Sequence, residues 1–217
     1  MKSIRYAIAA LTVLAGCEGM DQLPDTNAVT TMAGAVTGGD AVGGPDVRSV
    51  SRCPDGLPET LNPPADATLL PVMGAKGVQI YVCATPAAGG DPVFTLKAPH
   101  AVLSQGGDVA AIHFAGPAWQ ALDGSQVAGA RLASAPSPDP TAIPWLLLQA
   151  TPTAAPGLFA DVTTIQRLNT EGGVAPATGC DAAHIGTQVL VPYRADYFFY
   201  HPAGGANHLK QCRSSTP

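Results

Sequence analysis

The segment from His113 to Asp123 carries the side chains best suited to chemistry in this sequence. It brings an imidazole, the indole of Trp119 and a carboxylate together around two turn sequences. His113 and Asp123 could form an acid–base pair for a hydrolytic reaction if they lie within hydrogen-bond reach. The same three side chains could instead line a polar binding pocket beside an aromatic ring. A structural role is favoured over both, because a buried indole contributes enough apolar area to be present without a ligand.

The stretch 169–173, Asn-Thr-Glu-Gly-Gly, is a second candidate and directly follows an expected strand. It could be a binding loop in which Asn169 contacts a ligand and Glu171 acts as an acid or a metal ligand. Turn formation is the favoured interpretation, because asparagine bonds to nearby backbone and paired glycines supply positive φ. Arg167 lies among apolar neighbours, and we expect it to pair with a carboxylate such as Asp161 or Glu171.

The segment 193–200 is rich in aromatic residues. By strand alternation Tyr197 and Phe199 share one face, while Phe198 and Tyr200 share the other. This strand could stack against a glycan, but a strand covered on both faces is the favoured interpretation.

The known catalytic and cofactor signatures are missing from the sequence. It has no G-x-S-x-G elbow, no H-E-x-x-H pair, no nucleotide-binding glycine loop and no C-x-x-C pair. It therefore predicts neither a cofactor nor a metal site and leans towards a protein that is not an enzyme. The formal net charge of −5, without basic clusters, argues against binding to nucleic acid.

The N-terminus predicts export. Lys2 and Arg5 precede an apolar run, and residues 1–16 read as a signal peptide. The last residues, Leu14-Ala15-Gly16-Cys17, resemble a bacterial lipobox, in which the cysteine is lipidated and begins the mature chain. Acyl chains on Cys17 would make the membrane a partner. Glu18, in place of aspartate, favours the outer membrane, with the protein facing the periplasm or the cell surface.

Once Cys17 is assigned to lipid, four cysteines remain. An even number suits two disulfides in an oxidising compartment, and three connectivities are open. We favour Cys53–Cys212, which would tie the ends of the folded domain, together with Cys83–Cys180.

The chain divides into a flexible linker over 17–46, rich in small residues, and a single domain over 47–217. Short apolar segments separated by Gly and Pro turns predict an all-β fold, an antiparallel β-sandwich or barrel. The expected strands are Gly77–Cys83, Val93–Leu96, Val109–Phe114, Gln126–Ala133, Trp145–Ala150, Val162–Asn169, Gln188–Pro192 and Ala195–Tyr200.

Five ordered motifs resemble those of one family. They are G-V-Q-I-Y-V-C from 77, H-F-A-G-P-A-W from 113, I-P-W-L-L-L from 143, R-L-N-T-E-G-G-V-A-P from 167 and V-P-Y-R-A-D-Y from 191. The family is a bacterial and fungal group of secreted proteins known only as a domain of unknown function. The resemblance therefore implies a fold and a location but no activity.

Three functions remain open, in order of preference. The first is a non-enzymatic domain, tethered to the outer membrane, that binds a glycan or a protein partner through Trp119, His113, Asp123 and Asn169. The second is a periplasmic hydrolase-like enzyme that uses His113 with Asp123 or Glu171. The third is a purely structural protein of the cell envelope.

Overall fold

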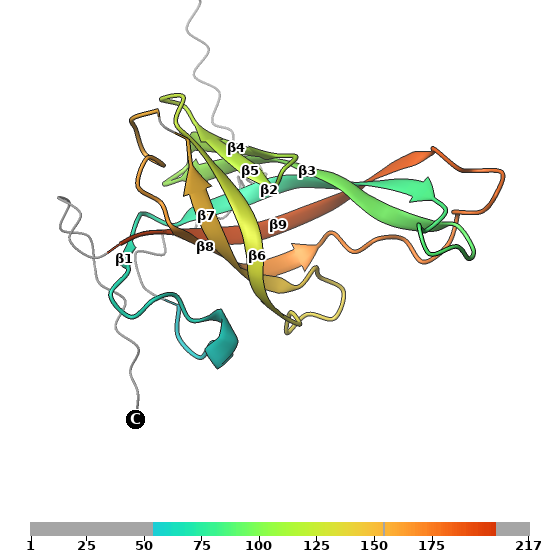
Figure 1. Cartoon of the computed structure of the whole chain (residues 1–217), viewed down its shortest axis with the longest axis horizontal. Coiled ribbons are helices and arrows are strands. Elements are labelled where there is room, and N and C mark those ends of the chain that lie inside the picture. The colour runs from blue at the N-terminus through green and yellow to red at the C-terminus, as the bar shows by residue number, and fades with distance from the viewer. Residues whose placement is uncertain (1–53, 154, 203–217) are drawn as a thin grey trace, which may run out of the picture. The chain divides into compact units, whose positions relative to one another are not determined.

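The computed structural model describes residues 54–153 and 155–202, which belong to one compact unit, Gly43–Pro217 (Figure 1). The predicted signal peptide, the lipidation site Cys17, the linker 17–46 and the Cys53–Cys212 bridge lie outside the described residues. They stay predictions. No helix in the described ranges is long and apolar enough to cross a membrane.

The described part of the chain is all-β, as the sequence predicts, and holds one short 3-10 helix, η1 (Glu59–Leu61). The strands are β1 (Thr68–Leu69), β2 (Met73–Ala84), β3 (Val93–Gln105), β4 (Asp108–Phe114), β5 (Ala118–Ala121), β6 (Gln126–Ala135), β7 (Trp145–Pro152), β8 (Thr164–Gly172) and β9 (Gln188–His201). Every strand pairing is antiparallel.

The sheet closes on itself. Strands β2 to β8 follow one another in order, and β9 lies between β8 and β2, so eight strands form a barrel (Figure 1). The short β1 pairs with the last residues of β9, beyond those that pair with β2. Of the two architectures that the sequence left open, the chain therefore adopts the barrel.

Two segments expected as separate strands, on either side of Tyr193, form the single strand β9, which runs through Pro192. A proline cannot donate to a ladder of hydrogen bonds and is tolerated where a strand has a free edge. The pairing of β8 with β9 ends at Gly172 and Tyr193, so from Pro192 outward β9 has a strand partner only on its β2 side. The proline therefore fits at this point.

The barrel interior is filled by large aromatic side chains packed against small ones. The fully buried rings include Trp119, Phe159, Tyr197 and Phe199, and alanines from β2, β3, β4, β7 and β9 leave room for them. Gly129 has the same function on β6, because a Cβ there would lie 3.0 Å from the indole of Trp119. Alternation along each strand places Trp119, Tyr197 and Phe199 on the inner face, whereas Phe159 comes from the connection between β7 and β8.

A second apolar cluster covers the outer face of part of the barrel. Leu61 of η1 is fully buried there together with Phe198 and Tyr200 of β9. The Gln166 amide donates to the Leu61 carbonyl at 2.6 Å, and the Tyr200 hydroxyl donates to Gln166 Oε1 at 2.5 Å. The prediction that the aromatic strand is covered on both faces is confirmed.

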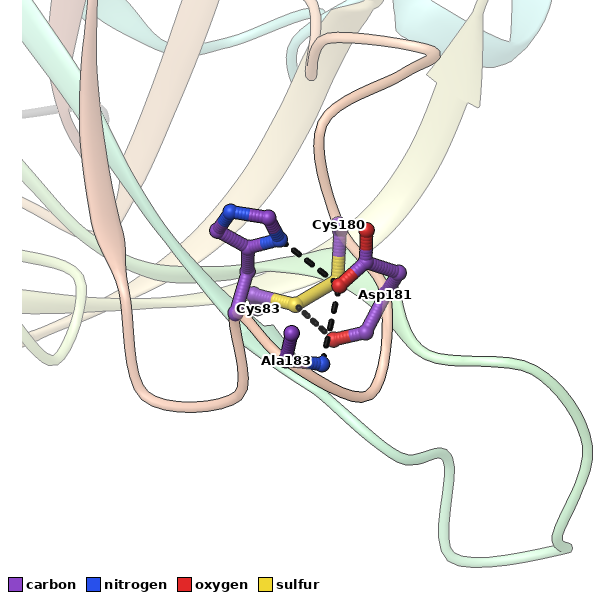
Figure 2. A network of polar contacts seen from close by, with 5 residues as sticks. Cys83, Cys180, Asp181 and Ala183 are labelled. Atoms are coloured by element: carbon purple, nitrogen blue, oxygen red, sulfur yellow. Dashed lines mark hydrogen bonds and ion pairs between the residues drawn. A yellow bond between two sulfur atoms is a disulfide. The ribbon is translucent and has the colours of Figure 1, made fainter.

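Strands β2, β3 and β9 continue together past the end of β8 (Figure 1). At this end the Cys83–Cys180 disulfide joins β2 to the segment between β8 and β9, with a Cα–Cα distance of 5.3 Å (Figure 2). The predicted pairing of these two cysteines is confirmed. Asp181 accepts hydrogen bonds from the Ala183 amide at 2.9 Å and from His184 at 2.6 Å, which orders the segment beside the bridge.

Candidate functional site

The barrel interior brings His113 and Trp119 together, as the pocket hypothesis requires. They are direct partners in the β4–β5 pairing, and their rings stack with centroids 4.3 Å apart and planes 5° from parallel. The Tyr197 ring of β9 meets both edge-on, at 5.3 Å from each. The result is an aromatic group of three rings, each at most 2% exposed.

His113 is held as a neutral imidazole. Its Nδ1 lies 2.9 Å from the Ala118 carbonyl oxygen, which can only accept, so Nδ1 carries the proton. Burial lowers the pKa of His113 from 6.5 to about 4, outweighing the hydrogen bond to Ala118, and the charge of Arg167 lowers it further. At neutral pH this histidine therefore has no charge to offer a ligand.

Arg167 faces the same interior, because it is the register partner of Tyr197 between β8 and β9. Its Nε and Nη2 donate to the Pro144 carbonyl at 3.3 and 2.7 Å. The expected pairing with Asp161 or Glu171 is wrong: within the described ranges Arg167 forms no ion pair. Glu171 lies beyond a bulge in β8, and this bulge turns its side chain to the other face of the barrel wall.

Four polar groups with no well-formed hydrogen bond to a described residue are buried here. They are Gln79 Nε2, Trp119 Nε1 and the hydroxyls of Tyr193 and Tyr197. The two hydroxyls form no hydrogen bond of good geometry, but they lie close enough to each other, and Tyr197 to Arg167, for weak hydrogen bonds to act on their pKa. Each of these side chains is at most 2% exposed. Such groups cost free energy when left unpaired, roughly 1–3 kcal/mol each.

These groups are gathered at one end of the barrel interior. The Arg167 charge acts on the pKa of Tyr81, His113, Tyr193 and Tyr197. A Cβ on Gly173 would meet Tyr193 Cβ at 2.8 Å and Gln79 Cγ at 3.3 Å, so these side chains adjoin each other. We call this region the polar end of the barrel; its residues are Gln79, Tyr81, His113, Trp119, Arg167, Tyr193 and Tyr197.

The two tyrosines of the polar end stay protonated. Burial raises the pKa of Tyr193 and of Tyr197. The Tyr197 hydroxyl raises the pKa of Tyr193 further, while the hydrogen bond with Tyr193 lowers that of Tyr197. Arg167 acts in the opposite direction, because its positive charge lowers the pKa of both. Tyr81, whose pKa is also raised by burial, donates its hydroxyl to the Gly173 carbonyl at 2.6 Å.

Asp123 lies outside the polar end, and its hydrogen bonds to Ser125 and Leu158 give it a structural role. It accepts from the Ser125 amide and hydroxyl at 2.9 and 2.6 Å, and from the Leu158 amide at 2.7 Å. The Ser125 hydroxyl, followed by the amides, holds the pKa of this exposed carboxyl below its usual range. The last residue of β5, Ala121, lies two residues after Trp119, which is about 7 Å further along the strand. Asp123 lies beyond the end of β5, and none of its hydrogen bonds to described residues joins it to His113.

Asn169 and Glu171 face outward from the barrel wall. Asn169 has a φ of 50° and donates to Asp196 Oδ2 at 2.8 Å, while Glu171 is the register partner of exposed Arg194. The prediction that the paired glycines supply positive φ is confirmed, at 62° and 82°, although β8 continues through 169–172 as a bulged strand. The structure therefore joins His113 with Trp119 but brings neither of them to Asn169, Glu171 or Asp123.

The polar end is rich in donors, lined by rings, and includes one positive charge. This composition suits binding of a ligand with acceptor atoms better than proton transfer, because its histidine is neutral and buried. Of these residues, sequence reasoning missed Gln79, Tyr81 and Tyr193 as a group with Arg167. The signal was a polar residue at alternate positions of an apolar strand. In the described residues no group of three or more His, Cys, Asp or Glu is placed to hold a metal.

Comparison with known proteins adds a match to one family model but no activity. Searches of curated proteins and of solved structures found no significant match. A family model matches from the end of β3 to the end of β9, which includes every residue of the polar end except Gln79 and Tyr81. Residues 104–201 thus match the family described as "Protein of unknown function (DUF3455)", in line with the resemblance seen in the sequence.

Proposed function

We propose that this protein is a non-enzymatic binding domain of the bacterial cell envelope, anchored to the outer membrane through lipid on Cys17, and that a small ligand occupies the polar end of the barrel. The lipobox-like sequence at 14–17 supports the anchor. The Cys83–Cys180 disulfide supports an oxidising compartment, because such bridges are rare in the cytosol.

One observation carries the ligand: four buried polar groups, none with a well-formed hydrogen bond to a described residue, gather around a single arginine inside the barrel. Native interiors leave very few polar groups unpaired. Acceptor atoms of a bound molecule would satisfy these donors, and the stacked rings of His113 and Trp119 provide an apolar surface against which a flat ligand could lie. A glycan unit is one such ligand.

The contacts that the hydrolase alternative requires are not among those of the described residues. It needs His113 within reach of Asp123 or Glu171. His113 hydrogen-bonds the Ala118 carbonyl, and Asp123 is occupied by Ser125 and Leu158. The binding hypothesis is therefore favoured, and catalysis by these residues stays a prediction.

Native mass spectrometry of the full-length protein tests the proposal. The protein is expressed with its own signal in an oxidising periplasm and purified in mild detergent. We expect a non-covalent small-molecule adduct, and a covalent mass increase from acyl chains on Cys17. The variant Tyr197→Phe removes one unpartnered hydroxyl from the site and should lose the adduct.

Tyr200→Phe is the matched control. It removes the same atom from the other face of β9, where the hydroxyl donates to Gln166 outside the barrel interior. The adduct should survive this change. A protein that carries no adduct, or one whose adduct persists in Tyr197→Phe, would contradict the proposed site and leave water as the occupant of the polar end.

A further inference from the structure

The charge of Arg167 has no counterion in the polar end. The side chains facing it come from β2 (Gln79, Tyr81), β4 (His113), β5 (Trp119) and β9 (Tyr193, Tyr197), and none of them is acidic. Among the described residues, Arg167 donates to the Pro144 carbonyl, and a weaker hydrogen bond from Arg167 to the Tyr197 hydroxyl lowers the pKa of that tyrosine. A half-buried guanidinium bonded only to neutral oxygens retains its unbalanced charge and unused donors, because it has five N–H groups.

The neighbouring polar atoms add further donors. Trp119 Nε1 and Gln79 Nε2 can only donate, and neither has an acceptor among the residues that the structure describes. The two tyrosine hydroxyls remain protonated, since burial raises their pKa. The region thus holds one positive charge and several donors, alongside the acceptor atoms of Gln79, of the tyrosine hydroxyls and of the unprotonated His113 Nε2. Its positive charge, which no acidic side chain here balances, is what a neutral sugar would leave uncompensated.

A single carboxylate fits this arrangement. An arginine fork binds a planar carboxylate through two parallel hydrogen bonds. One negative charge balances the one positive charge of the region, whereas a phosphate dianion would leave a net charge in a largely buried site. The remaining donors would reach the second oxygen or the polar groups near it.

We propose that the ligand of the polar end is a small molecule carrying one carboxylate, bound by Arg167, with its body against the rings of Tyr197, His113 and Trp119. This inference rests on the proposed binding function and adds the ligand class. The carboxylate could belong to a sugar acid or to an aromatic acid, and the test separates these two sources.

Two matched pairs of probes test the charge: glucuronate against glucose, and benzoate against benzamide. Calorimetric titration of the full-length protein in detergent gives the dissociation constants. Charge-assisted hydrogen bonds predict that the acid of at least one pair binds about 10- to 100-fold more tightly than its neutral counterpart. The pair that shows this preference identifies the source of the carboxylate.

Variants assign the preference to Arg167. Arg167→Gln should reduce the affinity for the acid to that for the neutral probe, and Arg167→Lys should retain part of it, because the charge remains but the fork is lost. Arg194→Gln, the same change on the exposed outer wall, should leave both affinities unchanged. Near-UV circular dichroism verifies that each variant is folded, and the preference of the wild type tests the inference even if Arg167→Gln does not fold.

The outcomes separate this inference from the proposed function. Equal binding of the acidic and neutral probes would overturn the carboxylate and leave a binding site. If no probe binds, the adduct from native mass spectrometry decides: a released molecule with one acidic group supports the inference, and a neutral one overturns it. The absence of both probe binding and an adduct would remove the site itself.

Discussion

The buried, neutral His113 makes folding stability depend on pH between about pH 4 and pH 6.5. Burial lowers its pKa from 6.5 to about 4, so between these pH values the imidazole is protonated in the unfolded chain and neutral in the folded chain. The stabilising contribution is complete above pH 6.5, falls as the pH drops, and levels off below about pH 4. Between pH 7 and pH 5 this single residue should cost about 2 kcal/mol.

Urea unfolding at pH 7, 6 and 5, followed by tryptophan fluorescence, measures this loss. His113→Gln removes the titration while keeping a side chain that can donate to the Ala118 carbonyl. The variant will be less stable at pH 7, but its stability should decline less steeply. The comparison of slopes cancels the exposed carboxylates Asp139 and Asp181, whose lowered pKa values act at more acidic pH in both proteins.

Parallel pH profiles for the wild type and His113→Gln would refute the reasoning. They would mean that the imidazole becomes protonated inside the barrel, with water or a counterion beside it, and that the dry stack with Trp119 does not persist in solution. A steeper profile for the variant would point to a different titrating group.

Three further predictions concern the framework around the site. Gly129→Ala places a methyl 3.0 Å from the stacked indole and should cost about 1–3 kcal/mol in urea unfolding, whereas a substitution on the exposed face of the same strand should cost much less. Asp123→Ala should speed hydrogen exchange at the amide of Leu158 and leave the barrel strands protected; unchanged exchange would contradict the tether. Replacing both Cys83 and Cys180 by serine opens a connection spanning 97 residues and should cost up to about 4–5 kcal/mol, and an unchanged melting temperature would show that the bridge constrains little.

Local signals in the sequence predicted the local parts of this fold. Apolar alternation and glycine turns identified most of the antiparallel strands but missed β1 and β5, so the direct pairing of His113 with Trp119 was not predicted. Closure of the barrel depends on the pairing of β8 with β9, and a pattern within one strand carries no information about its distant partners. The sandwich and the barrel therefore both remained open, and the aromatic strand was read as part of a sandwich.

The membership of the polar end was hidden for a related reason. Along β2 the apolar residues Val78, Ile80 and Val82 resemble the core face, yet they are only half-buried, while Gln79 and Tyr81 between them point inward. A polar residue on an inner face is predicted only when its partners are known, and those partners lie on β8 and β9, far along the chain. The inward placement of polar Gln79 and Tyr81, in place of the apolar residues beside them, thus marks the part of the barrel interior that apolar packing does not account for.

The end of the barrel next to this region has its own structural requirement. From Tyr193 towards Gln188, β9 no longer pairs with β8. Here β2, β3 and β9 continue outside the closed barrel, so the other strands do not cover their inner face. The segment between β8 and β9 covers that face instead: Cys180 bonds to Cys83, the Cys83 amide donates to the Thr187 carbonyl, and the Tyr81 hydroxyl donates to the Gly173 carbonyl. Because Tyr81 belongs to the polar end, its hydrogen bond to Gly173 joins the polar end to this segment. The disulfide ties the same segment to β2 further along, near Tyr81 in the chain, so both contacts hold the segment against this strand.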